Sequence, residues 1–355
     1  MAQQNQLSPM MQKYMETKAE YPDCILFYRL GDFYEMFFED AITSSRELEL
    51  TLTGKMCGLE ERAPMCGVPH HAVDTYLNRL VSKGYKVAIC EQVEDAKNAK
   101  GLVRREVTRV VTPGTNLNAC ALDEGKNNYI MSIVYLSDRY GLAIADVTTG
   151  DFYTTEVDSD RKLLDEISKF APSEIVCNEA FYVSGVNLED LRHRLNIAIS
   201  SLESWYFDDE MCKRTLSEHF HTATMEGLGL KDYPCGVVGS GALLKYLLET
   251  QKTDLSHISR VQAYTTGKFM VIDSSTRRNL ELVENMSLRK KHGSLLWLLD
   301  KTKTCMGARK LRSFIDKPLT NSRQINEIIN TNEYDPALDE EVQNYREWLQ
   351  EDYDP

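Results

Sequence analysis

Two short apolar runs on either side of a glycine–aspartate pair constrain the fold of this chain more than any other stretch. Residues 24–29 (CILFYR) and 33–37 (FYEMF) are rich in strand-forming side chains. Gly31 and Asp32 between them are typical turn residues, so the pattern predicts a β-hairpin. Because side chains alternate between the two faces of a strand, we expect Phe33 and Glu35 to share one face.

This pair of side chains has a functional and a structural interpretation. An aromatic ring such as that of Phe33 can wedge between stacked bases and kink a duplex. A carboxylate such as that of Glu35 is repelled by phosphates unless it accepts a hydrogen bond from a base edge. An ordinary buried hairpin with Glu35 at its edge explains the same spacing, so these residues alone leave both interpretations open.

Several separated motifs resemble, in the same order, the N-terminal part of the bacterial MutS family of DNA mismatch-repair proteins. The motifs are GDFYE at residues 31–35, GVPHHA at 67–72, VAICEQ at 87–92, VTPGT at 111–115 and DSSTRRNLE at 273–281. The resemblance extends over residues 1–330. It implies that Phe33 stacks on a mispaired or unpaired base and that Glu35 contacts that base.

Alternating helix and strand signals predict the α/β fold class, with two consecutive mixed α/β domains followed by a partial, mainly helical domain. By resemblance, residues 1–118 are a mismatch-recognition domain, and residues 119–255 are a connector domain with a ribonuclease-H-like strand arrangement. Residues 256–330 are then the beginning of a helical core domain. Residues 331–355 form an acidic tail that departs from the family pattern.

Periodicity and turn residues also predict individual elements. We expect strands at residues 50–53, 85–90, 104–111, 129–135, 141–146, 151–155 and 268–273, and a short helix or turn at 94–100. We expect helices from Pro9, at residues 39–48, 73–81, 161–170, 239–252, 295–299 and 306–315, and one capped by Ser274 or Ser275 that carries Leu280, Leu282 and Val283. Residues 57–69, which contain prolines and glycines, are expected to form a loop, and residues 116–127 a linker.

The formal net charge of −13 is unevenly distributed along the chain. Residues 119–255 are acidic, so they are a poor surface for DNA. Residues 256–330 carry 14 Lys and Arg against 6 Asp and Glu. Their basic side chains form either a phosphate-facing surface or solvated helix faces; they are Arg277, Arg278, Arg289, Lys290 and Lys291.

Three arginines in the predicted strand 104–111 are candidate contacts to the DNA backbone. Arginine contacts to phosphates supply affinity without reading sequence. Arg104, Arg105 and Arg109 fit this role, and a solvated strand with alternating charges explains them equally well.

The sequence predicts no metal site. Its nine cysteines are scattered without a Cys-x-x-Cys pair, which is typical of buried free thiols in a reducing cytoplasm. His219 and His221 are the nearest thing to a ligand pair, but no cysteine or carboxylate pattern completes it. Asp146, Asp151 and Glu156 lie where a metal nuclease of ribonuclease-H fold would place carboxylates, although the turn at 148–150 argues against their convergence.

The resemblance also has consequences for cofactors and partners. Similar full-length proteins have an ATPase domain with a Gly-x-x-x-x-Gly-Lys-Ser/Thr phosphate loop, a spacing that is absent from this sequence. We therefore expect a chain without enzymatic activity and without catalytic residues or a cofactor of its own, since ATP and Mg²⁺ bind that ATPase domain. The expected partners are double-stranded DNA with mismatches or small insertion/deletion loops and other mismatch-repair proteins; similar full-length proteins dimerise.

Neither a long apolar run nor a secretory signal is visible, so we expect a cytoplasmic, nucleoid-associated bacterial protein without membrane contact. Three functions remain open at this point. The chain reads mismatched DNA, or it is an interaction module of the repair machinery without useful DNA affinity, or it is a metal-dependent nuclease that uses Asp146.

Overall fold

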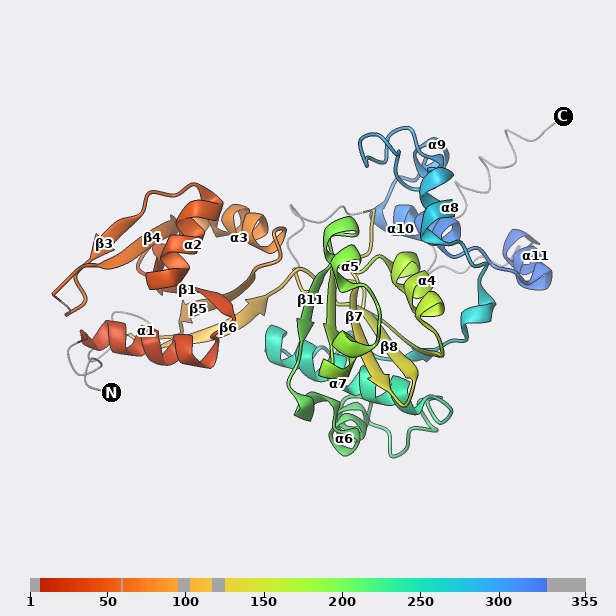
Figure 1. The fold of residues 1–355 in the computed structure, drawn as a ribbon, viewed down its shortest axis with the longest axis horizontal. Helices are drawn as coiled ribbons and strands as arrows, with labels where there is room; N and C mark the ends of the chain where they lie inside the picture. Colours follow the sequence, from red (N-terminus) through yellow and green to blue (C-terminus); the bar gives the residue numbers. More distant parts are fainter. Residues whose placement is uncertain (1–6, 59, 95–102, 117–124, 331–355) are drawn as a thin grey trace. The chain divides into compact units, whose positions relative to one another are not determined.

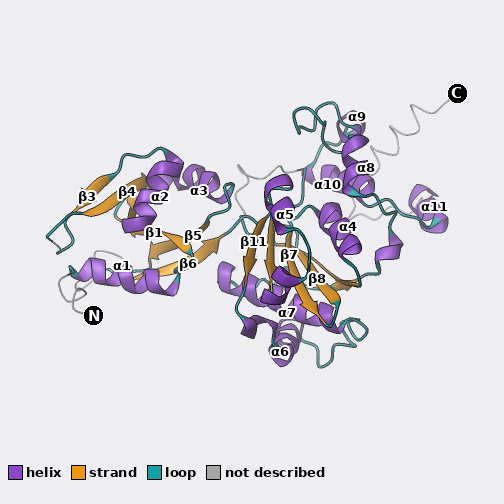
Figure 2. Ribbon diagram, in the orientation of Figure 1, coloured by secondary structure: helices purple, strands orange, loops and turns teal. Residues whose placement is uncertain are grey.

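The computed structural model describes residues 7–58, 60–94, 103–116 and 125–330. The chain forms two compact units, the first comprising Met1–Ala121 with Lys245–Leu255 and the second Leu122–Leu244 with Ser256–Pro355. Each unit contains a six-stranded mixed sheet with helices packed against it (Figures 1 and 2). Short helices dominate the described chain after residue 264. The predicted fold class, two mixed α/β parts followed by a mainly helical part, is confirmed.

The first unit begins with a helix and the predicted hairpin. Its elements are α1 (Pro9–Glu20), β1 (Cys24–Leu30), β2 (Phe33–Phe37), α2 (Phe38–Leu48), β3 (Thr53–Lys55), β4 (Ala63–Pro69), the 3₁₀ turn η2 (His70–Ala72), α3 (Val73–Val81), β5 (Lys86–Gln92) and β6 (Arg105–Val111). The sheet has the order β3-β4-β2-β1-β5-β6. Strand β1 is parallel to β5 and antiparallel to β2, and the other neighbouring strands are antiparallel.

Helices cover both faces of this first sheet (Figure 1). On one face, which we call the α1 face, Met11 and Tyr14 of α1 pack in one core with Tyr28. On the other, the α2–α3 face, Leu48 of α2 and Leu77 of α3 belong to a second core. Strands β1, β2, β4, β5 and β6 therefore contribute side chains to two different cores, which fixes their register.

The expected loop at residues 57–69 is wrong, because Ala63–Pro69 is strand β4, between β3 and β2. Pro64 and Pro69 lie at its second and last positions, near the strand ends, where the missing N–H is best tolerated. The expected strand at 50–53 is displaced to Thr53–Lys55. Residues 95–102 and 117–124, which include most of the expected helix or turn and of the linker, lie outside the described residues.

The second unit contains a three-stranded antiparallel meander followed by helix-connected strands. Its elements are β7 (Ile130–Leu136), β8 (Arg139–Asp146), β9 (Asp151–Val157), α4 (Asp160–Phe170), β10 (Glu174–Cys177), η3 (Glu179–Val183), α5 (Leu188–Arg194), β11 (Ala198–Ser201), η4 (Ser204–Phe207), α6 (Asp209–Phe220), α7 (Pro234–Gln251, whose residues from Lys245 on belong to the first unit), β12 (Gln262–Ala263), η5 (Thr266–Lys268), α8 (Ser274–Asn279), α9 (Leu295–Leu299), α10 (Cys305–Asp316) and α11 (Ser322–Asn330).

Strands β9-β8-β7-β10-β11 are consecutive neighbours in the second sheet, with β10 and β11 parallel to β7. This is the ribonuclease-H-like arrangement that the resemblance implies. Helices α4 and α5 pack on one face, and α6 and α7 on the other. A β-carbon at Gly141 of β8 would lie 2.1 Å from the Cys235 carbonyl oxygen, so only glycine lets the first turn of α7 approach the sheet this closely.

Two predictions for residues 268–283 are wrong. Residues 268–273 form no strand; within this segment the structure has an isolated bridge from Phe269 to Leu319. Helix α8 ends at Asn279, before the three residues that it was expected to carry. The side chain that caps α8 is that of Asp273, which accepts a hydrogen bond of 2.7 Å from the Thr276 N–H, and not a serine.

The cysteines that the structure describes are all free thiols, and most are buried. Burial raises the pKa of Cys66 to about 11 and that of Cys90 to about 12, so both remain protonated at neutral pH. The expectation of buried free thiols is confirmed for the described positions except Cys235 and Cys305, which are half-buried. Among the described helices, none has the length and apolar character needed to cross a membrane.

Candidate nucleic-acid interface

Strands β1 and β2 form the hairpin that the sequence predicts, with a two-residue turn. Leu30 pairs with Phe33 in the antiparallel register, which leaves Gly31 and Asp32 as the loop. Gly31 has φ +60°, whereas Asp32 does not have a positive φ. This is the sign pattern of a type II′ turn, which favours glycine at its first central position. Gly31 therefore sets the turn that presents Phe33.

Phe33 and Glu35 lie on the α1 face of the sheet, as strand alternation predicts. Tyr34 and Met36 belong to the core of the α2–α3 face, and Phe37 belongs to the core of the α1 face. The Phe33 side chain is 45% exposed, so the interpretation as an ordinary buried hairpin does not hold for this ring. The structure therefore places an exposed aromatic ring beside a carboxylate, directly after a tight turn.

The Glu35 carboxylate is held by a lysine that sequence reasoning missed. Lys55 at the end of β3 places its Nζ atom 2.5 Å from Glu35 Oε2. The same ammonium lies 5.6 Å from the centre of the Phe37 ring. Strands β3 and β2 both pair with β4, which brings these three side chains together on one face. No signal in the sequence could have found Lys55 while β4 was expected to be a loop.

Gly67 of β4 lies directly opposite Glu35 in the β2–β4 register. A β-carbon at this position would lie 3.6 Å from Glu35 Cγ, 3.8 Å from Phe33 Cδ1 and 3.2 Å from the Tyr34 carbonyl oxygen. The Phe33 and Glu35 side chains thus border space that a larger residue would fill. The glycine that opens the motif at residues 67–72 keeps the sheet surface beside them open.

Arg29 and Glu91 contact the hairpin on the α2–α3 face of the sheet. Arg29 Nε donates a hydrogen bond to the Gly31 carbonyl, and its guanidinium lies 5.4 Å from the centre of the Tyr34 ring. The Tyr34 hydroxyl donates to Glu91 Oε1, and Glu91 Oε2 lies 3.8 Å from Arg29 Nη1. Burial, followed by the bond to Glu91, raises the pKa of Tyr34, which keeps the hydroxyl a donor at neutral pH. The turn that carries Phe33 is therefore fixed before any ligand binds.

Arg105 is the one of the three candidate arginines that shares the α1 face with Glu35. Its guanidinium lies 5.4 Å from the centre of the Tyr28 ring, and Tyr28 pairs with Glu35 in the β1–β2 register. Its Nε atom donates a hydrogen bond of 2.7 Å to the Arg29 carbonyl. Part of the hydrogen-bonding capacity of Arg105 is therefore used to hold the sheet together.

The structure does not bring the other two arginines to this face. Arg104 is 73% exposed and forms an ion pair with Glu106, whose side chain points away from the α1 face. Arg109 pairs in register with Ile89, which belongs to the core of the α2–α3 face. Because two of the three arginines lie on the opposite side of the strand, the structure does not bring all three to one surface. A contact of each arginine with the DNA backbone stays a prediction.

Comparison with known proteins connects this geometry to a family. The family models for MutS domain I, MutS domain II and MutS domain III match residues 8–119, 128–259 and 275–351. The chain belongs to the MutS family.

Similar full-length proteins come from several bacteria. The chain is 61% identical over 320 residues to the DNA mismatch repair protein MutS of Lachnoclostridium phytofermentans, a match that covers 90% of this chain and 34% of that protein. The MutS of Ruminiclostridium cellulolyticum is 53% identical over 322 residues (90% and 36%), and that of Acetivibrio thermocellus 52% over 322 residues (90% and 37%). The chain spans about a third of the length of these curated relatives.

In the part that matches MutS domain II, the three candidate nuclease carboxylates do not converge. Asp146 is fully buried and accepts hydrogen bonds from the backbone N–H and the hydroxyl of Thr148, at 2.8 and 2.6 Å. Asp151 pairs with Asp146 at one end of the β8–β9 pair. Glu156, near the other end, accepts a hydrogen bond of 3.0 Å from the Gly236 N–H at the start of α7. These carboxylates support turns and helix ends and do not assemble a two-metal site.

The structure gives the two histidines of the same domain, His219 and His221, different surroundings. His219 Nε2 lies 2.9 Å from the Ile258 carbonyl oxygen, so this nitrogen is engaged within the fold. His221 ends α6 in the left-handed conformation, with φ +52°. In the described ranges, no group of three or more His, Cys, Asp or Glu side chains is placed to hold a metal ion.

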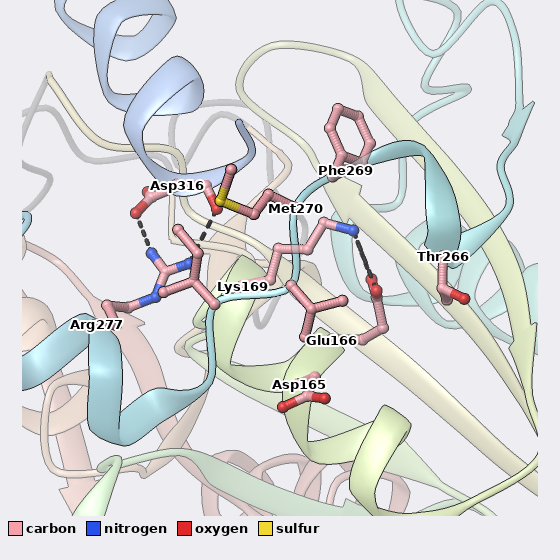
Figure 3. A pocket seen from close by; sticks show the side chains of 10 residues that line it. Asp165, Glu166, Lys169, Thr266, Phe269, Met270, Arg277 and Asp316 are labelled. Atoms are coloured by element: carbon pink, nitrogen blue, oxygen red, sulfur yellow. Dashed lines mark hydrogen bonds and ion pairs between the residues drawn. The ribbon is translucent and has the colours of Figure 1, made fainter. Parts of the chain in front are cut away.

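A pocket lies where the segment after β12 packs against α4 of the second unit (Figure 3). Lys169 Nζ lies 3.0 Å from Glu166 Oε2, and these side chains are only 10% and 6% exposed. The rings of Tyr264 and Phe269 are each centred 4.7 Å from the same ammonium. Burial lowers the pKa of Lys169, although the Glu166 carboxylate partly opposes this. Lys169 therefore ties α4 to the segment that leads into MutS domain III.

A second lysine is buried in the same junction. Lys317, directly after α10, lies 3.8 Å from the centre of the Phe170 ring, and the rings of Tyr129 and Tyr153 are centred 5.1 and 5.4 Å away. Burial, followed by the charge of Lys169, lowers the pKa of Lys317 to about 8. The junction thus holds two ammonium groups among aromatic rings.

The basic residues of the domain III segment have unequal surroundings. Arg277 pairs with Asp316, and these side chains are 13% and 14% exposed. Arg277 therefore holds α8 to α10 and does not face a phosphate. Lys291 pairs with Asp300. A phosphate-facing surface stays a prediction for the exposed members of the group, which are Arg278, Arg289, Lys290 and the paired Lys291.

Proposed function

We propose that this chain is the mismatch-reading region of a DNA mismatch-repair protein. It binds double-stranded DNA that contains mismatches or small insertion/deletion loops. The observation that carries the proposal is the exposed Phe33 ring, which stands beside the Glu35 carboxylate on a braced two-residue turn. The similarity to proteins named DNA mismatch repair protein MutS supports it.

In the proposed mechanism, Phe33 approaches from the minor groove and stacks on one mispaired or unpaired base, which kinks the duplex. A mismatch lacks full pairing and stacking, so this deformation costs less there than in a matched duplex. Unstacking costs a few kcal/mol per step, and a modest reduction corresponds to about tenfold to hundredfold discrimination. The protein therefore reads deformability and not base sequence.

Glu35 has an oxygen available for the stacked base. Its Oε2 atom is bonded to Lys55, whereas Oε1 accepts no hydrogen bond from any residue that the structure describes. We assign to Glu35 Oε1 a hydrogen bond with the base, accepted by the carboxylate or donated by its protonated form. Phosphate contacts from basic residues, with Arg105 on the same face and Arg104 and Arg109 on the same strand, add salt-dependent affinity.

The proposal extends to domains, partners and location. Residues 1–118 act as the recognition domain, 119–255 as the connector and 256–330 as the start of the core, in a dimeric assembly with other mismatch-repair proteins. Binding itself requires neither ATP nor Mg²⁺. We place this activity at the bacterial chromosome in the cytoplasm, because the similar proteins are bacterial mismatch-repair proteins.

Fluorescence anisotropy with two duplexes that differ at one G·T pair tests the proposal. We expect the wild-type chain, in EDTA and without ATP, to bind the G·T duplex at least tenfold more tightly than the paired duplex. Phe33→Ala should bring the two affinities to similar values, because it removes the ring that stacks at the easily deformed mismatch.

Phe314→Ala is the matched control, because Phe314 on α10 is also a partly exposed ring. It should leave the preference unchanged. A Phe33→Ala protein that still prefers the G·T duplex would refute the stacking role. A folded wild-type chain that binds neither duplex would favour the interaction-module alternative.

A further inference from the structure

We propose that Lys55 is a positioning residue for Glu35. Lys55 neutralises the Glu35 carboxylate and leaves one of the two carboxylate oxygens for the base. This inference rests on the proposed function. It assigns a role in DNA binding, exerted through Glu35, to a residue outside the motifs that carry the family resemblance.

The first argument is electrostatic. Phosphates of both strands repel a carboxylate at a DNA-facing surface, and the repulsion grows as water is excluded. Lys55 is the cation paired with Glu35 among the residues that the structure describes. The Lys55–Glu35 pair has no net charge, so the phosphates repel it much less than they would repel an unpaired Glu35. Glu35 can therefore contact a base without a large loss of affinity for every duplex.

The second argument is geometric. Lys55 Nζ is bonded to Glu35 Oε2 at 2.5 Å and lies 5.6 Å from the centre of the Phe37 ring, which is 1% exposed. The buried ring restrains the ammonium by a cation–π contact, and the ammonium restrains the carboxylate. Because Lys55 holds Oε2 of Glu35, Oε1 is the oxygen left to bind a ligand that stacks on Phe33.

The alternative is that Lys55 contacts a phosphate independently of Glu35. The two roles differ in what happens when Glu35 loses its charge. A positioning lysine becomes unimportant once the carboxylate is a neutral amide, because nothing remains to be neutralised. A lysine that binds phosphate by itself is equally important with either side chain at residue 35.

A double-mutant cycle in DNA affinity separates these roles. The proteins are the wild type, Lys55→Met, Glu35→Gln and the double variant, each measured on the paired and on the G·T duplex. We expect Lys55→Met to weaken binding to both duplexes about fivefold to tenfold when Glu35 is present, and less than about twofold in the Glu35→Gln background. Lys55→Arg should restore most of the affinity, because it restores the charge.

Lys83→Met is the matched control. Lys83 Nζ lies 2.9 Å from Glu47 Oε2, with side chains 46% and 19% exposed, against 35% and 17% for Lys55 and Glu35. The substitution removes the same charge from a similar pair at residues outside the hairpin site. It should change affinity less than about twofold. Thermal unfolding of each variant verifies that it is folded.

Equal losses from Lys55→Met in the wild-type and Glu35→Gln backgrounds would overturn the inference. This outcome is distinct from failure of the proposed function. If the wild type showed no preference for the G·T duplex, the mismatch-reading proposal would fail. The coupling measured on the paired duplex would still decide the relationship between Lys55 and Glu35.

Discussion

The hairpin edge and the α4 junction contain the same chemical groups at different burial. At the hairpin, Lys55 pairs with Glu35 beside the Phe37 ring, and the two charged side chains are 35% and 17% exposed. At the junction, Lys169 pairs with Glu166 among aromatic rings, and the two are 10% and 6% exposed. The comparison shows that a lysine–glutamate pair with an aromatic neighbour is not by itself a binding site.

The difference in burial decides what each pair can do. A buried charge that loses its partner keeps its full desolvation penalty, so breaking the junction pair should destabilise the fold substantially. A pair that is partly solvated contributes little to stability, so its oxygens and protons can be shared with a ligand. The difference therefore supports the proposed role of the hairpin pair in recognition and gives the junction pair a structural role.

Removing the carboxylate of the buried pair gives the largest expected change in stability. Glu166→Ala leaves Lys169 buried without its carboxylate and removes the acceptor of a 2.6 Å hydrogen bond from Tyr264. We expect the free energy of unfolding to fall by about 3 kcal/mol. Urea denaturation followed by tryptophan fluorescence measures this, because both tryptophans that the structure describes, Trp205 and Trp297, lie in the second unit.

The matched substitution at the hairpin is Glu35→Ala, followed by circular dichroism. It should lower the free energy of unfolding by less than about 1 kcal/mol. Equal losses at the two sites would contradict the contrast between a structural and a functional pair. A loss of mismatch preference in a folded Glu166→Ala protein would also contradict this contrast, because the junction pair would then contribute to recognition.

The second prediction uses pH to sharpen the same contrast. The pKa of Lys317 is lowered to about 8 in the folded chain, and an unfolded lysine titrates near 10.4. Between these values Lys317 binds more protons in the unfolded chain, so its contribution to the free energy of unfolding rises with pH. From pH 7.5 to 9.5 this contribution amounts to about 2 kcal/mol.

Lys317→Met should remove that contribution, so the difference in unfolding free energy between wild type and variant should change by this amount between the two pH values, as tryptophan fluorescence will measure. Buried thiols such as Cys66 and Cys90, whose pKa is raised by burial, lower the stability of both proteins alike over this range. The range ends below pH 10 because burial raises the pKa of Tyr129 and Tyr264 in the same cluster. Those tyrosines stay protonated in the folded chain and lower its relative stability only at higher pH. Parallel pH curves for wild type and Lys317→Met would show that Lys317 is not buried as a cation.

The smallest expected effect is that of Arg104→Ala, at an exposed ion pair. Arg104 is 73% exposed and its partner Glu106 is 49% exposed, so the free energy of unfolding should change by less than about 0.5 kcal/mol. If Arg104 contacts a phosphate, affinity should fall about equally for paired and G·T duplexes, and the salt dependence should weaken by about one counterion. An effect confined to the G·T duplex would contradict a backbone role.

Local sequence patterns were sufficient to predict the hairpin and the shared face of Phe33 and Glu35, whereas roles for these two residues were implied only by the family resemblance. Gly31 sets a two-residue turn, and strand alternation places Phe33 and Glu35 on one face; both effects act over a few residues. The exposure of Phe33 could not be predicted in this way, because it depends on where α1 stops covering the sheet. That boundary is a tertiary property.

Lys55 was missed for a non-local reason. Its position beside Glu35 depends on β4, and the prolines and glycines of residues 57–69 argue against a strand there. Pairing with β2 and β3 on both sides overrides this preference. The error at residues 268–273 has a similar origin. Phe269 of this segment packs against Lys169 of α4 and bridges to Leu319, whereas Met270 and Val271 are 53% and 66% exposed, so the apolar run does not form a buried strand of a sheet.

The most direct test of the central claim is energy transfer between dyes at the two ends of a short G·T duplex. A kink shortens the distance between the ends, so transfer should rise when the wild-type chain binds the G·T duplex at saturating concentration. It should rise much less with Phe33→Ala at saturation. An equal rise with Phe33→Ala, or no rise with the wild type, would contradict the account, because an exposed ring beside a neutralised carboxylate would then not deform the duplex.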